Sequence, residues 1–173
     1  MLCVALLACT PAPKQTEIER SEMLSDSQWE LICKKPEYFK ELLALQDKTV
    51  AGKEISVRKL QSLMPQTEED FQIFMATERY AIIEEDGDQV ESPQALYIVA
   101  GEMAADDTLD MMEQYLKWFD WSDGWVSETL WEKAIEIEKR HPEKFDCLMR
   151  HNELYEAWKE YRDELLEYEE ESD

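Results

Sequence analysis

The sequence predicts an all-α protein with one compact domain of about six to eight helices, for which antiparallel helix pairs are one arrangement. Only four glycines and six prolines occur in 173 residues, too few for the turns that an all-β sandwich or barrel needs about every 8 to 12 residues. Apolar residues recur at helical spacings of three and four along most of the chain. The length and the apolar fraction of 44% fit one domain that buries roughly 70% of its unfolded surface.

The first two helices are predicted on either side of Pro36, which stops one helix and starts the next. Asp26 or Ser27 caps the first of them. Residues 49–57 are expected to form a loop with a short extended piece before a helical turn at 60–64. The apolar residues of the two helices are Trp29, Leu31 and Ile32 in the first and Phe39, Leu42, Leu43 and Leu45 in the second.

The middle of the chain predicts two further helices. The first opens at Pro65 and Thr67 and continues until Gly87, within EEDGDQ, breaks it. Ser92 and Pro93 then supply a cap and a first turn for the second. Their inward residues are Phe71, Phe74, Met75 and Ile82 in the first and Leu96, Val99 and Met103 in the second.

The C-terminal half is more strongly periodic. Asp106 or Asp107 caps a helix that ends at WSDG, residues 121–124, and Ser127 caps another that ends at Pro142. Asn152 caps a last long helix, after which residues 169–173 are expected to be an acidic tail. The inward residues are Leu109, Met112, Leu116 and Phe119, then Leu130, Ala134 and Ile137, and finally Leu154, Trp158, Tyr161, Leu165 and Tyr168.

Two proline-containing stretches resemble each other. Trp29-Glu30 precedes Pro36-Glu37-x-Phe39, and Trp131-Glu132 precedes Pro142-Glu143-x-Phe145. Both are typical of a corner between two helices. The second interval is longer by about one helical turn, which would preserve the buried face. Two copies with few identities leave a true repeat open, and chance is the favoured explanation.

Acidic residues greatly outnumber basic ones. The chain has 41 Asp and Glu against 18 Lys and Arg, a formal net charge of −23. Phosphate backbones and anionic lipid headgroups would be repelled, so we do not expect the chain to bind nucleic acid. Such a surface most often serves solubility, and it also suits a basic protein partner.

Residues 1–8 are apolar and end in small side chains. The residues Leu6-Leu7-Ala8-Cys9 resemble the lipobox of bacterial lipoproteins, in which an apolar signal segment ends before a cysteine. The resemblance implies that residues 1–8 are a signal-peptide remnant and that Cys9 becomes a lipid-bearing N-terminus in the cell envelope, facing the periplasm or the cell surface. Export signals begin with basic residues, whereas no Lys or Arg precedes Cys9. A start codon upstream of Met1 would explain this departure from the pattern. The alternative is a cytosolic chain whose first residues pack on the core.

Under this interpretation, residues 9–25 are the lipidated N-terminus and a flexible tether, and residues 26–168 are the helical domain. The acyl chains would supply the membrane contact, because no later segment reaches the roughly 18 apolar residues of a spanning helix. Cys33 and Cys147 would be the only other cysteines left after cleavage. They are expected to be buried thiols or, in an oxidising compartment, a disulfide, provided that their Cα atoms lie within about 7 Å.

No motif in the chain identifies an enzymatic reaction or a bound cofactor. DDTLD at residues 106–110 is similar to the aspartate-rich string of isoprenoid synthases, but the chain is too short for that fold, and helix capping is the favoured explanation. His141, Cys147 and His151 lack a fourth ligand at a diagnostic zinc spacing. We therefore expect no metal, no cofactor and no catalytic residue.

An aromatic cluster between Trp118 and Trp131 flanks the turn Ser122-Asp123-Gly124. Because a turn cannot bury every ring, Trp121 and Trp125 form the candidate interaction surface. The sequence thus predicts a lipid-anchored accessory or scaffold module that binds a protein partner through an acidic helical surface. An immunity-type inhibitor of a basic toxin and a small helical enzyme that uses paired carboxylates are the alternatives.

Overall fold

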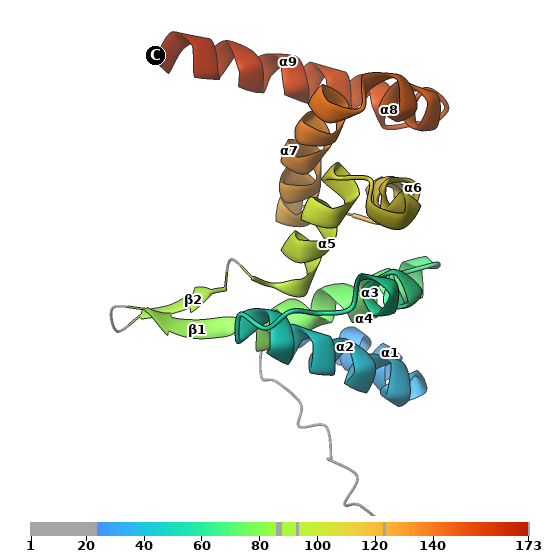
Figure 1. The fold of residues 1–173 in the computed structure, drawn as a ribbon, viewed down its shortest axis with the longest axis vertical. Helices are drawn as coiled ribbons and strands as arrows, with labels where there is room; N and C mark the ends of the chain where they lie inside the picture. The colour runs from blue at the N-terminus through green and yellow to red at the C-terminus, as the bar shows by residue number, and fades with distance from the viewer. Residues whose placement is uncertain (1–23, 86–87, 93, 123, 173) are drawn as a thin grey trace, which may run out of the picture.

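Helices dominate the structure, and the expected all-α fold is confirmed. The computed structural model describes residues 24–85, 88–92, 94–122 and 124–172, without the side chains of 82–91, 124–128, 166 and 168–172 (Figure 1). Within these residues nine α-helices occur, slightly more than expected, because 57–63 forms a full helix capped by Ser56. They are α1 (Asp26–Lys34), α2 (Pro36–Val50), α3 (Val57–Leu63), α4 (Glu68–Met75), α5 (Leu96–Ala105), α6 (Met111–Leu116), α7 (Gly124–Arg140), α8 (Pro142–Met149) and α9 (Tyr155–Ser172).

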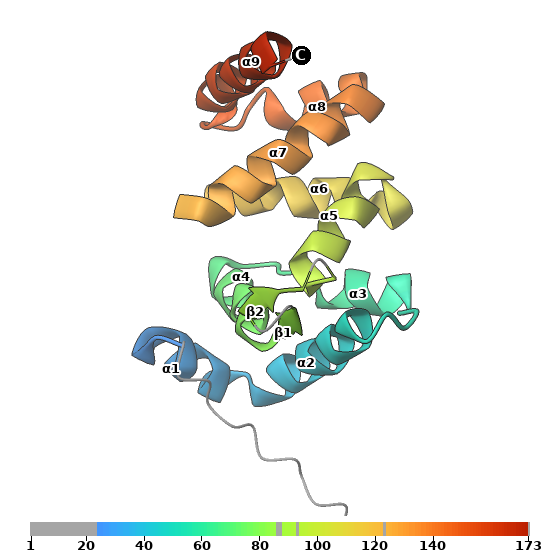
Figure 2. The same cartoon turned by 90° about the vertical axis from the view of Figure 1, so that its left-hand side faces the viewer.

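The helices are stacked in layers along the long axis of the molecule. In Figure 2, α1 and α2 lie at one end, followed by α3 and α4, then α5 and α6, then α7 and α8, with α9 at the other end. Helix α5 connects the two halves, because it packs against α2 on one side and against α6 and α7 on the other. The buried apolar side chains form a single cluster from Leu24 to Trp158. One core therefore runs through the stack, as expected for one domain.

The two proline corners have the same backbone geometry. Lys35, before Pro36, has φ −130° and ψ 55°, and His141, before Pro142, has φ −136° and ψ 57°. Proline keeps the preceding residue out of the α region and favours the first position of the next helix. The predicted corners are confirmed, and this local rule accounts for their likeness without a repeat.

A β-hairpin replaces the end of the helix that was expected to continue to Gly87. Helix α4 is capped by Thr67, as predicted, but it ends at Met75. A 3₁₀ segment, Ala76–Tyr80, then leads to β1 (Ile82–Glu85), which pairs antiparallel with β2 (Asp88–Glu91). The placement of Ile82 on a helical face was therefore wrong, because β-branched residues favour a strand here over the helical spacing.

Helix α5 begins at Leu96, later than Ser92 predicts. The Ser92 hydroxyl instead accepts a hydrogen bond of 3.1 Å from the N–H of Gln94, and the Ser92 carbonyl accepts one of 2.9 Å from the N–H of Ala95. These bonds form a turn before the helix, so the predicted cap was wrong.

The segment 106–110 between α5 and α6 does not cap a helix as predicted. Asp107, Leu109 and Asp110 have positive φ angles of 50°, 52° and 59°, and neither aspartate makes a side-chain cap bond. Leu109 was expected to point inward. It is instead the one large apolar side chain that is well exposed among the described residues, at 40%.

Several predicted boundaries differ from the observed ones. Leu24 is buried in the core, and the Ser25 hydroxyl accepts a 3.2 Å bond from the N–H of Gln28, so the folded region begins before residue 26. Helix α7 begins at Gly124, which places Ser127 inside it, not at its cap. Helix α9 continues to Ser172, past the predicted end of the domain at 168. Residues 1–23, with the lipobox and Cys9, lie outside the described residues.

Candidate functional site: a groove between α6 and the start of α9

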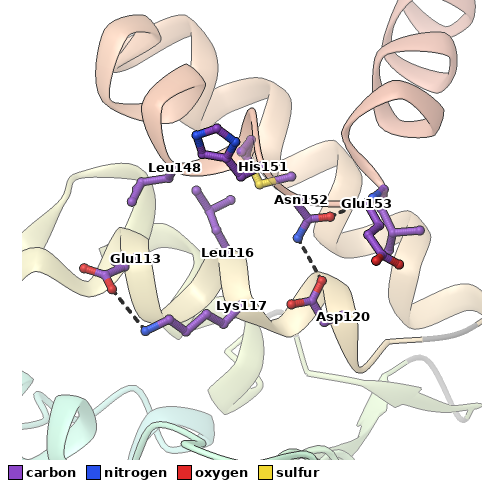
Figure 3. Close-up of a pocket in the computed structure, with 10 residues that line it drawn as sticks. Glu113, Leu116, Lys117, Asp120, Leu148, His151, Asn152 and Glu153 are labelled. Atoms are coloured by element: carbon purple, nitrogen blue, oxygen red, sulfur yellow. Dashed lines mark hydrogen bonds and ion pairs between the residues drawn. The ribbon is translucent and has the colours of Figure 1, made fainter.

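A groove of about 610 Å³ lies between α6, with its 3₁₀ continuation Lys117–Asp120, and the connection from α8 to α9 (Figure 3). Its floor is apolar. Leu116 and Met149 are almost fully buried, and Leu148 and Leu154 are half-buried. The volume falls in the range of about 300 to 1,000 Å³ that is usual for ligand sites. The floor can therefore receive an apolar side chain from a bound molecule.

Two polar contacts shape the rim. The Lys117 ammonium donates a hydrogen bond of 3.0 Å to Glu113, one helical turn away, and the Asn152 amide donates one of 2.8 Å to Asp120 (Figure 3). The Asn152 side-chain oxygen also accepts a 2.8 Å bond from the N–H of Leu154. Asn152 therefore fixes the backbone just before α9 and links it to Asp120 on the opposite wall of the groove.

The rim carries more negative than positive charge. Glu113, Asp120 and Glu153 supply three carboxylates against the one ammonium of Lys117, which leaves a net charge of −2 with His151 neutral. Glu153 and His151 are exposed, and neither makes a side-chain hydrogen bond or ion pair within the part of the chain that the structure describes. Both side chains are therefore open to a bound molecule.

The contact between Asp146 and Tyr155 holds α8 against α9 beside the groove. The Tyr155 hydroxyl donates a hydrogen bond of 3.0 Å to the Asp146 carboxylate. This bond, together with the one from Arg150, lowers the pKa of Asp146 below its ordinary value. Burial, followed by the bond to Asp146, raises the pKa of Tyr155. Asp146 consequently remains ionised at neutral pH and adds to the negative potential at this end of the stack.

The predicted surface at Trp121 and Trp125 is placed only in part. Trp121 is half-buried, with its ring centroid 6.1 Å from that of Phe71, so it packs at the edge of the core. Trp125 lies in the first turns of α7, and its side chain is outside the described residues. Trp118 and Phe119 are fully buried. A binding role for Trp121 and Trp125 stays a prediction.

Cys33 in α1 and Cys147 in α8 are free thiols, and both are exposed. Helices α1 and α8 lie far apart in both views of the stack, so the candidate disulfide is not formed (Figures 1 and 2). The expectation of buried thiols was also wrong. Ile32 and Phe145, which are near neighbours of the two cysteines in sequence, occupy the inward faces of these amphipathic helices.

The three residues that were weighed as zinc ligands are not brought together as a site. The Nε2 atom of His141 lies 3.0 Å from the carbonyl oxygen of Ala105, Cys147 is on the exposed face of α8, and His151 lines the groove. Across the described ranges, no group of three or more His, Cys, Asp or Glu side chains is arranged to hold a metal ion.

The aspartates of DDTLD are held by basic residues from the α7–α8 corner. Arg140 pairs with Asp106, and Lys144 pairs with Asp107 and, at 3.3 Å, with Asp110. These ion pairs join the α5–α6 connection to the next layer of the stack. Their role is therefore structural, although it differs from the capping role that the sequence suggested.

The groove itself was not predicted. Its walls come from residues 113–120 and 148–154, two segments that contain no recognisable motif. The contact that joins them, between Asp120 and Asn152, spans 32 positions of the chain. The sequence signal at this site was limited to the capping character of Asn152 and to the inward positions of Leu116 and Leu154.

Comparisons with protein-family models, with curated proteins and with solved structures gave no match to this chain. No helix in the described ranges has both the length and the apolar character that a membrane span requires. The geometry and charge of the groove are consequently the main guide to function.

Proposed function

We propose that this chain is a lipid-anchored protein of the bacterial cell envelope that acts as an accessory module and binds a basic protein partner. The observation that carries the binding part of the proposal is the groove, in which the half-buried Leu148 and Leu154 are bordered by three carboxylates and one ammonium. An apolar anchor residue flanked by Lys or Arg would complement both features.

The acidic surface and the apolar floor have different roles in this proposal. Exposed carboxylates act over about 8 Å at physiological salt, so they accelerate the approach of a basic partner and repel acidic ones. Burial of the partner's anchor against Leu148 and Leu154 supplies affinity, at roughly 25 cal/mol per Å² of apolar surface removed from water. Association with the partner should consequently slow at higher salt.

The anchor is proposed on the lipobox-like residues Leu6-Leu7-Ala8-Cys9. Metabolic labelling with a palmitate analogue tests it by comparing the native protein with Cys9→Ala in bacterial cells. Incorporation that requires Cys9 supports a lipid anchor. An unlabelled native protein, or labelling that persists in Cys9→Ala, contradicts it and leaves the groove to be judged separately.

Binding at the groove is tested by site-specific photocrosslinking in cells. A crosslinking amino acid replaces His151 on the rim, and the matched control carries it at Glu132, an exposed position of α7 outside the groove. We expect a discrete adduct with a protein rich in Lys and Arg from position 151 only. Equal adducts at both positions, or none at position 151, would rule the groove out.

A pair of leucine variants separates binding from folding. Leu148→Ser removes a half-buried residue from the groove floor, and Leu43→Ser removes a half-buried residue from α2, which does not line it. Both variants lose packing of a similar kind, so both should lose stability by about 1 to 2 kcal/mol. Only Leu148→Ser should lose the adduct at position 151.

A further inference from the structure

The β-hairpin has two open edges. In the described part of the chain its sheet contains β1 and β2 alone, so each strand has one neighbour and one free side. Figure 1 shows the hairpin extending sideways from the stack, away from the helical layers. Each strand has only four residues, and a two-stranded hairpin of this kind is marginally stable without further contacts.

The register identifies the backbone groups that face outward. Ser92 donates a 2.8 Å hydrogen bond to the carbonyl of Ala81, immediately before the paired residues of the hairpin. Hydrogen-bonded and non-hydrogen-bonded pairs alternate along an antiparallel ladder, so every second residue of each strand directs its N–H and C=O groups away from its partner. Counting from Ala81 and Ser92, these residues are Ile82, Glu84, Gln89 and Glu91.

The charge of the two strands decides what can pair with these edges. Glu84, Glu85, Asp88 and Glu91 give the strands four carboxylates, and the strands contain no basic residue. Glu85 is directly opposite Asp88 in the backbone register, and like charges at directly opposite positions disfavour an antiparallel pair. A second copy of the hairpin would add to this repulsion, whereas a strand with Lys or Arg would relieve it. Charged edges of this kind oppose self-pairing and leave pairing with a basic strand open.

We propose that an outer edge of this hairpin accepts an extended basic segment of another protein as a third strand. Main-chain hydrogen bonds to the outward groups of one edge would supply affinity, and alternate Lys or Arg side chains would supply specificity. The surface is separate from the groove, so this inference does not depend on the proposed function.

The test uses the full chain labelled with ¹⁵N and the synthetic heptapeptide Lys-Val-Lys-Val-Lys-Val-Lys. We expect amide exchange to slow by at least about tenfold at Ile82 and Glu84 if β1 is the edge used, or at Gln89 and Glu91 if it is β2. The control peptide has the same composition with alternate D-residues, which keeps the charge and prevents a regular strand. Exchange at these amides should not slow with the control.

A charge-reversed variant, Glu84→Lys with Glu91→Lys, completes the test. It should lose binding of the Lys-Val peptide by about tenfold or more and gain binding of the corresponding Glu-Val peptide. Its hairpin amide shifts, compared with those of the native chain, verify that the strands still form. Equal binding of the L-peptide and the alternate D,L-peptide, or the absence of edge protection with the L-peptide, would overturn the inference. Protection of the native chain by the Glu-Val peptide would also overturn it.

Discussion

The side chain of Gln46 in α2 caps α5 at Leu96, fifty residues later in the sequence. Its Oε1 atom accepts a hydrogen bond of 2.8 Å from the backbone N–H of Leu96, and both residues are fully buried. Ala95, the residue before the helix, has no side-chain acceptor for this group. The first turn of α5 therefore obtains from another layer of the stack the partner that a helix N-terminus normally finds locally.

Replacement of Gln46 by Met should destabilise the protein by about 1 to 2 kcal/mol, because it keeps the volume and leaves the buried N–H of Leu96 without an acceptor. The Nε2 atom of Gln46 is buried and has no hydrogen-bond partner among the described residues. Gln46→Met also removes this unpaired polar group, which keeps the net loss of stability small. Urea unfolding monitored by circular dichroism measures the change. The control, Gln94→Met at an exposed position, should change the free energy of unfolding by less than about 0.5 kcal/mol.

This cap illustrates which features the sequence could predict. Local rules identified the all-α fold, the corners at Pro36 and Pro142 and the cap at Thr67, because each depends on residues within one or two turns. The start of α5 and the groove depend on pairs such as Gln46 with Leu96 and Asp120 with Asn152, which lie far apart in the chain. Such pairs exist only once the layers have packed.

The backbone conformation of Leu109 gives a second prediction. Its φ of 52° is unfavourable for a residue with a side chain. The left-handed conformation costs such a residue roughly 1 to 2 kcal/mol, and glycine avoids this cost at an entropic penalty of roughly 0.5 to 1 kcal/mol. Leu109→Gly should therefore be more stable than Leu109→Ala by about 1 kcal/mol in thermal or urea unfolding. A Gly variant less stable than the Ala variant would show that this backbone conformation is not adopted in solution.

The close approach of α5 to α6 and α7 at Gly101 gives a third prediction. A Cβ atom there would lie 3.0 Å from the Tyr115 hydroxyl oxygen and 3.2 Å from Cγ of Lys133. Tyr115 is buried and packs on Trp118 with ring centroids 4.8 Å apart, so it cannot move freely. Overpacking of about 1 to 3 kcal/mol should outweigh the helix propensity of alanine, about 1 kcal/mol, and Gly101→Ala should destabilise the protein.

A double-mutant cycle tests this explanation of the Gly101 contact. Tyr115→Phe removes the nearest atom, so Gly101→Ala should cost less in the Tyr115→Phe background than in the native one. Equal costs in the two backgrounds, measured by urea unfolding, would assign the effect to a source other than the tyrosine hydroxyl.

The cluster around Lys133 predicts a dependence of stability on pH. A hydrogen bond from Lys133, with the charges of Lys133 and Arg140, lowers the pKa of Glu136 below its ordinary value of 4.5. A lowered folded-state pKa gives stability that is present above the unfolded value and is lost as the pH falls through the folded value. Glu136→Gln should be less stable than the native chain at pH 7. The loss should be less than about 1 kcal/mol, because the ion pair between Lys133 and Glu136 is partly exposed to solvent. In urea unfolding the difference should shrink as the pH falls below about 4.5 and Glu136 becomes protonated in the folded chain.

The thiols of Cys33 and Cys147 give a last prediction. The sequence allowed a disulfide between them, whereas the observed fold leaves both free. Cys33 and Cys147 are free and exposed, and the helices that carry them, α1 and α8, lie far apart in the stack. A disulfide would need Cα atoms within roughly 7 Å of each other. Both should react with iodoacetamide in the native protein about as fast as in the urea-unfolded protein, because neither needs the core to open. Peptide mapping without reductant measures both sites. A linked Cys33–Cys147 peptide pair would contradict the stacking of the layers, because a bridge would require α1 and α8, which lie in distant layers, to meet.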